Sequence, residues 1–153
     1  MYKPRQLLAL LVITSLAGCF SEPDDSEQIR QRIAEMEAAV EAGEARRFAG
    51  YLVEDFQCKD GITNRRAARA FVARQLVSQQ KVRVQLGPVR VILNEQSPFY
   101  ASADFEALLL GGPRLMPDSG QLYRIDTKWR KEDGDWMLVE ADWERGLKSM
   151  GSE

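Results

Sequence analysis

Two cysteines, Cys19 and Cys58, are the strongest nucleophiles in this chain of 153 residues. The chain contains no histidine, so it lacks both the side chain that titrates most readily near neutral pH and the commonest metal ligand. A phosphate-binding loop, a serine nucleophile elbow and paired carboxylates at a recognisable spacing are also absent from the sequence. The sequence therefore predicts neither a metal nor a cofactor, and it leaves carboxylates as the main candidates for acid–base chemistry.

The first 18 residues have the composition of a secretory signal. Lys3 and Arg5 form a short basic region, a mainly apolar run covers residues 7–16, and the small residues Ala17 and Gly18 follow. The run is too short to span a bilayer as a helix. A basic end, a short apolar run and small residues before a cleavage site are typical of a leader, so we predict that residues 1–18 are removed.

The end of this leader resembles the bacterial lipobox, which lipoprotein signal peptidase recognises; its residues here are Leu16, Ala17, Gly18 and Cys19. The resemblance implies diacylglycerol on the Cys19 sulfur, cleavage before Cys19 and a third acyl chain on the new amino terminus. Two or more such attachments anchor a protein stably, whereas one holds it only marginally. Phe20 occupies the position where an Asp is the familiar inner-membrane retention signal. We therefore expect a lipid-anchored protein of the cell envelope, in the outer membrane and facing the periplasm.

Acylation of Cys19 leaves Cys58 without an intrachain partner, so a structural disulfide is excluded. The favoured interpretation of Cys58 is a small buried apolar residue, and a reactive thiol is the alternative. Without the leader, the chain has 19 basic and 23 acidic residues and a net charge of −4. This balance argues against nucleic acid as a partner, because nucleic acid favours a basic face.

Helices are predicted at the start of the mature chain, after the lipidated cysteine and a short polar tether over residues 19–25. Asp25 and Gln28 match a capping box for a first helix that ends at Gly43. Its apolar residues recur at helical spacing: Ile29, Ile33, Met36 and Val40. The next elements are expected in this order: a helix over residues 44–52, a strand and turn over residues 55–63, and a helix that Asn64 caps.

Strands are predicted after residue 80, where apolar residues begin to alternate with polar ones. Gly87 and Pro88 indicate a bend in the first of them, and Asp133-Gly134 is a strong hairpin signal. The expected strands cover residues 82–93, 99–110, 121–131 and 135–143, with a Gly- and Pro-rich loop over 111–120. We therefore predict one α+β domain over residues 26–146 and a frayed tail over residues 147–153.

The alternation also predicts which strand faces are solvated. In the second long strand, Asp104 and Glu106 are expected to face solvent because Ala103 and Phe105 are suited to the core. The next strand has a charged face that is expected to be solvated, with a surface for a protein partner as the alternative: Arg124, Asp126, Lys128 and Arg130. Both faces of the last strand begin apolar. This strand is therefore expected to be central and covered on both sides, by a helix on one and a second subunit on the other.

The order of these elements resembles the NTF2-like superfamily, also called the SnoaL-like or cystatin-like cone fold. Residues 29–43 resemble its long first helix, residues 51–56 the end of the second, residues 64–76 the third, and residues 133–138 the closing Asp-Gly-x-Trp hairpin. The resemblance implies three helices packed in the concave face of a curved antiparallel sheet, with a conical pocket between them. Some members are isomerases, dehydratases or cyclases, and many others only bind ligands or dimerise, so the fold alone does not determine the function.

The resemblance to the isomerases would place an acid after the second helix, where Asp60 stands beside Lys59. Asp60 as a base and Tyr51 as a hydrogen-bond donor are therefore the catalytic candidates, although a turn at Asp60 favours exposure. The expected pocket residues are Tyr51, Cys58 and Trp143.

The favoured hypothesis is a non-catalytic lipoprotein that binds a small apolar ligand or a protein partner beside the membrane. The alternatives are an isomerase or cyclase that uses a pocket carboxylate, and a module that forms a homodimer through the outer sheet face.

Overall fold

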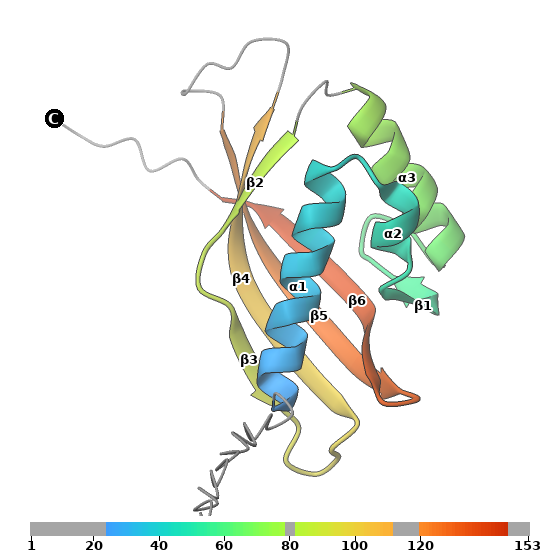
Figure 1. Ribbon diagram of the computed structural model, residues 1–153, viewed down its shortest axis with the longest axis vertical. Helices are drawn as coiled ribbons and strands as arrows, with labels where there is room; N and C mark the ends of the chain where they lie inside the picture. Colours follow the sequence, from blue (N-terminus) through green and yellow to red (C-terminus); the bar gives the residue numbers. More distant parts are fainter. Residues whose placement is uncertain (1–23, 79–81, 112–119, 147–153) are drawn as a thin grey trace, which may run out of the picture.

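The computed structural model describes residues 24–78, 82–111 and 120–146, which form helices packed against one curved sheet (Figure 1). The helices are α1 (Asp25–Glu41), α2 (Ala45–Ala49) and α3 (Arg65–Ser78). The strands are β1 (Leu52–Gln57), β2 (Val82–Leu86), β3 (Arg90–Leu93), β4 (Tyr100–Gly111), β5 (Gln121–Glu132) and β6 (Asp135–Arg145). All three helices lie on the concave side of the sheet, as predicted.

The sheet is mixed, which corrects one part of the prediction. Its strand order is β1-β6-β5-β4-β2, and β3 also pairs with β4. The pairs among β2 to β6 are antiparallel, but β1 runs parallel to β6. The predicted α+β fold class is confirmed, with one parallel strand added at the edge.

The segment after α2 is a strand, and the prediction that it ends the second helix is wrong. Helix α2 ends at Ala49, and the backbone N–H of Leu138 in β6 donates to the carbonyl oxygen of Tyr51 at 2.8 Å. Leu52 and Val53 are almost fully buried where β1 pairs with β6. Pairing with the free edge of β6 outweighs the helical pattern because tertiary contacts override weak local propensity.

Helix α1 is capped by Asp24, one residue earlier than the capping box predicted. The Asp24 carboxylate accepts a hydrogen bond from the Glu27 backbone N–H at 2.8 Å. Asp25 instead accepts hydrogen bonds from Lys131 Nζ at 2.6 Å and Trp136 Nε1 at 3.0 Å. The hydrogen bond from Lys131, followed by that from Trp136, lowers the pKa of Asp25. Asp25 therefore attaches the start of α1 to the β5–β6 hairpin.

A β-bulge in β6 explains why both faces of this strand begin apolar in the sequence. Leu138 pairs with Trp129 and Glu140 pairs with Lys128, so Val139 is an extra residue without an opposite partner. An extra residue exchanges the two faces of a strand. Leu138 before the bulge and Ala141 after it are consequently both buried in the same core. The second covered face that the sequence predicted is therefore not required.

The two long strands β4 and β5 follow the predicted alternation. Ala101, Ala103 and Ala107 of β4 are buried against the helices, whereas Glu106 and Arg124 are exposed. Asn64 caps α3 by accepting from the Ala67 N–H at 2.8 Å, as predicted. Asp133 and Gly134 both have positive φ, as a tight two-residue hairpin turn requires.

Candidate functional site

A cavity of about 220 Å³ lies between the helices and the concave face of the sheet. Helices α1 and α3 contribute apolar side chains such as Met36, Val40 and Phe71, and the strands contribute residues such as Phe105 and Ile125. Among its lining residues, only Glu37 has an ionisable side chain. The cavity is therefore suited to an apolar molecule with, at most, one polar group.

Small residues on the walls leave this space open. Ala68 of α3, Ala107 of β4 and Ala141 of β6 all line the cavity, and each is buried. Protein interiors are otherwise packed to the density of organic crystals. Because these three side chains end at Cβ, they leave a gap between the walls. The larger residues of α1 do not fill this gap.

The polar atoms of the buried wall are already paired within the protein. The Thr127 hydroxyl donates to the Ala103 carbonyl oxygen at 2.7 Å and accepts from Trp129 Nε1 at 2.9 Å. Both Thr127 and Trp129 line the cavity and are buried. Because these groups are satisfied, they do not require a ligand or a water molecule in the cavity.

Glu37 is the functional candidate that the sequence interpretation missed. It lies on α1 four residues after Ile33 and three before Val40, so it shares their apolar face. Burial raises its pKa, and the negative charge of Glu41 raises it further. No hydrogen-bond or ion-pair partner for its carboxylate lies within the described ranges. A carboxylate that interrupts an apolar helical stripe was the available signal in the sequence.

We predict that Glu37→Gln stabilises the fold at pH 7. The folded state holds a proton on Glu37 at a pH where the unfolded chain, with a pKa near 4.5, has lost it. The charged carboxylate therefore destabilises the fold above its folded pKa, and this effect disappears as the pH falls below about 4.5. Relief of the i,i+4 repulsion with Glu41 and of desolvation should raise the free energy of unfolding by about 0.5 kcal/mol.

Urea unfolding of both chains at pH 7 and pH 4 measures this effect. The two chains should differ at pH 7 and converge at pH 4. An equal or lower stability of the Gln variant at pH 7 would show that Glu37 has a stabilising partner.

The structure brings only one of the sequence-predicted pocket residues into the cavity wall. Trp143 lines the cavity, and its ring stacks on Phe71 with centroids 6.1 Å apart. Tyr51 is outside the set of lining residues and is half-buried, with the Arg32 guanidinium 5.7 Å from its ring centroid. Cys58 is a free, buried core residue that also does not line the cavity. Asp60 is exposed in the turn between β1 and α3.

The lipobox residues Leu16, Ala17, Gly18 and Cys19 lie outside the described residues, so the proposed lipid attachment remains a prediction. Within the described part, no helix combines the length and apolarity needed to cross a membrane. The same residues contain no group of three His, Cys, Asp or Glu side chains placed to hold a metal ion.

The outer face of the sheet is charged. Asp104 accepts from Arg90 Nε at 2.9 Å, and Lys128 Nζ donates to Glu140 at 2.8 Å. Arg124 and Asp126 are exposed on the same face, as predicted. The strand faces that carry these residues are polar, and the predicted homodimer through this face remains untested.

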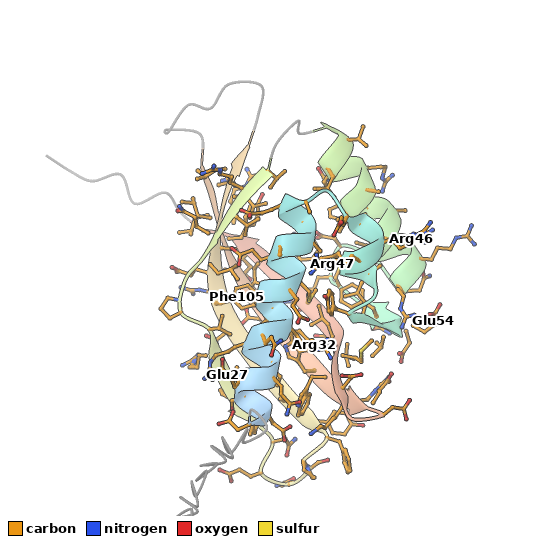
Figure 2. All side chains as sticks on the ribbon, viewed as in Figure 1. Glu27, Arg32, Arg46, Arg47, Glu54 and Phe105 are labelled. Carbon is orange, nitrogen blue, oxygen red and sulfur yellow. The ribbon has the colours of Figure 1, made fainter. Side chains whose placement is uncertain are left out.

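A second, shallow hollow lies on the side of α2 and α3. It is lined by Arg46, Arg65, Arg66, Arg69 and Glu54, together with Ala49 of α2 and Gly50 after it. Figure 2 shows Arg46 and Glu54 at this side of the molecule, away from Phe105 on the sheet. Arg65 is already engaged with the Leu52 carbonyl oxygen at 2.7 Å and with Glu54 at 3.1 Å.

No family model matches the sequence, and no curated protein matches it either. Solved structures do match the fold. A proposed scytalone dehydratase from Novosphingobium aromaticivorans has a TM-score of 0.71 at 14% identity, over 80% of this chain and 84% of that one. A proposed dehydratase of the NTF2-like family from Streptomyces avermitilis has a TM-score of 0.70 at 17% identity, over 80% and 96%.

A third structure, an NTF2-like protein with a cystatin-like fold from Novosphingobium aromaticivorans, has a TM-score of 0.66 at 20% identity, over 82% of this chain and 84% of that one. Identities this low establish the fold and leave the activity open. The described residues therefore have the NTF2-like, cystatin-like cone architecture.

Proposed function

We propose that this NTF2-like chain is a membrane-anchored envelope lipoprotein that binds a small apolar molecule in its cone. The observation that carries the binding proposal is the apolar cavity of about 220 Å³ between α1, α3 and the sheet. An apolar engineered cavity of about 150 Å³ stays dry and binds benzene. This cavity is therefore of a size for one or two fused hydrocarbon rings or a short branched chain.

Glu37 restricts the polar chemistry of such a ligand. A carboxylate in an apolar wall favours a hydrogen-bond donor or a cation opposite it, because either one compensates for desolvation. The ligand class is therefore an apolar body with a single donor group at one end. An acidic ligand is disfavoured, because two like charges in the cavity would repel one another.

Acid–base catalysis is the second candidate function, and Glu37 is the observation that favours it. A pocket carboxylate with a raised pKa is a typical general base. The names of two structural neighbours refer to dehydration. However, the lining residues include no tyrosine, lysine or arginine that would stabilise a developing negative charge. Binding without turnover is therefore the better supported function.

Ligand capture tests the binding proposal. The full-length protein is purified from membranes of the expressing cell, and molecules released by denaturation are identified by mass spectrometry. We expect a small apolar molecule in near-stoichiometric amount, and we expect the purified, emptied protein to bind naphthalene by calorimetry. If the emptied protein neither carries nor binds an apolar molecule, the binding proposal is wrong. If it converts the captured molecule and Glu37→Gln abolishes that conversion, the enzyme candidate replaces it.

Membrane anchoring is tested by Cys19→Ser. This variant lacks the sulfur that would carry diacylglycerol, so we expect an uncleaved or mislocalised precursor without incorporated fatty acid. Labelling with radioactive palmitate and cell fractionation provide the measurement, and Cys58→Ser is the matched control that should retain the label. Normal processing and membrane retention of Cys19→Ser would contradict the anchor.

A further inference from the structure

We propose that the β3–β4 hairpin is a second membrane contact, with its exposed apolar side chains embedded in the surface of the bilayer that holds the lipid on Cys19. This inference rests on the proposed lipid anchor. It goes further, because it assigns a face of the folded domain to the membrane.

The exposed apolar residues of the described part are concentrated in this hairpin. Five large hydrophobic side chains are exposed among the described residues: Ile92 at 54%, Leu93 at 41%, Phe99 at 57%, Tyr100 at 49% and Val77 at 85%. The first four belong to the hairpin, and Val77 lies near the end of α3. The register divides the four between the two faces of the hairpin, with Ile92 on the face of Ser102 and Leu93 on the face of Ala101, so they surround the end of the hairpin. Single exposed apolar residues need no explanation, but four at one end of a hairpin indicate an interaction site.

The hairpin folds as one unit, so its apolar residues lie on a fixed support. Ile92 pairs with Ser102, and Tyr100 lies two residues before Ser102 on the same face. Asn94 fixes the turn by accepting from the backbone N–H of Gln96 at 2.8 Å and of Ser97 at 3.2 Å. A rigid turn that is followed by Phe99 and Tyr100 loses little conformational entropy when these side chains enter another phase.

The position of α1 indicates that a membrane covers the exposed apolar side chains of the hairpin. Helix α1 begins at the same end of the molecule as this hairpin, whereas α3 ends at the opposite end (Figure 1). Helix α1 also contacts the segment just before β3, because Arg30 Nε donates to the Val89 carbonyl oxygen at 3.4 Å. Cys19 precedes Asp24 by five residues, which span at most about 17 Å. A lipid on Cys19 therefore keeps this end of the domain close to the bilayer.

The chemistry of this end favours apolar insertion over charge attraction. Phe and Tyr are side chains that partition to the membrane–water interface, where Tyr keeps its hydroxyl in water. The basic residues at this end are already paired with carboxylates: Arg30 with Glu27, Arg130 with Glu132 and Lys131 with Asp25. Asp24 and Glu95 are further negative charges, which an anionic surface would repel. We therefore expect the contact to form on neutral phosphatidylcholine and to gain nothing from anionic lipid.

Site-directed fluorescence tests this inference. Full-length lipidated protein carrying Phe99→Cys is labelled with a polarity-sensitive fluorophore, because Cys58 is only 9% exposed and Cys19 carries the lipid. The matched control is Val77→Cys, which places the same fluorophore at an exposed apolar position on the opposite end. In phosphatidylcholine vesicles we expect at least a twofold rise in emission at position 99, with quenching by spin-labelled lipid, and no change at position 77.

The outcomes separate this inference from the lipid anchor. If the protein floats with the vesicles but position 99 stays in water, the hairpin inference is wrong and the anchor stands. If emission at position 99 rises with protein concentration in the absence of vesicles, a second copy covers the hairpin and the inference is also wrong. If the mature protein has no lipid mass and does not float, both proposals are overturned. A response only in vesicles with phosphatidylglycerol would contradict apolar insertion.

Discussion

Ala107→Phe is expected to weaken naphthalene binding by at least about 100-fold, which corresponds to about 2.7 kcal/mol. Ala107 is buried in the middle of β4, between Leu86 and Tyr123 of the neighbouring strands, and it lines the cavity. A phenyl ring at this position occupies the volume that the ligand needs. Because the ring fills an existing space, the free energy of unfolding should fall by less than about 1 kcal/mol or rise. Calorimetric titration with naphthalene and urea unfolding measure the two quantities.

The control for this variant is Leu108→Phe. Leu108 is the next residue on β4 and is absent from the cavity lining. Its side chain points to the opposite face of the sheet, so a phenyl ring at this position adds volume outside the cavity. Naphthalene should bind this control as tightly as it binds the unaltered chain. If Ala107→Phe bound naphthalene as tightly as the unaltered chain does, naphthalene would bind outside the cavity. The proposed role of the cavity would then be wrong.

Trp129→Ala is expected to reduce the free energy of unfolding by about 3–5 kcal/mol. The Trp129 side chain is 1% exposed, and it pairs across the sheet with Ala101 on one side and Leu138 on the other. Its removal eliminates the largest apolar contact of the central strand and the indole hydrogen bond to Thr127. The melting temperature should fall by about 10–20 °C, measured by circular dichroism at pH 7.

Trp143→Ala is the comparison for this variant. Both tryptophans line the cavity, but Trp129 is almost fully buried, whereas Trp143 is half-buried and stacks on Phe71. Its loss should cost about 1–2 kcal/mol, because less contact area is removed and the wall can relax. If both substitutions cost the same, the cavity is filled in solution, and the wall around Trp143 is as tightly packed as the core.

Local signals in the sequence were sufficient for the elements whose structure depends on near neighbours. The Asn64 cap of α3, the bend at Gly87 and the turn at Asp133-Gly134 are all found where the sequence predicted them. Each depends on backbone preferences or hydrogen bonds within a few residues. The alternation on β4 and β5 was equally informative, because one face of a sheet is buried and the other is solvated.

Elements that depend on distant partners were not predictable in this way. Strand β1 forms because β6 offers a free edge, and β6 lies about 80 residues further along the chain. The bulge at Val139 shows only in the pairing of β6 with β5, although it decides which face carries Trp143. Glu37 lay on a predicted apolar face, but the cavity beside it exists only once α1 packs over the sheet.

The parallel pairing of β1 with β6 has a consequence for the order in which the protein folds. Leu52 pairs with Leu138, and Asp25 accepts a hydrogen bond from Trp136. The first quarter of the domain therefore depends on contacts with the last quarter. Contacts between residues this far apart raise the contact order and slow folding, because a long loop must close before they form. Until β6 is available, α1 lacks its Asp25 attachment and β1 lacks its partner strand. Because synthesis begins at the amino terminus, α1 and β1 lack these contacts until the last strand has been made, and we expect the native domain to form only after the whole chain has been synthesised.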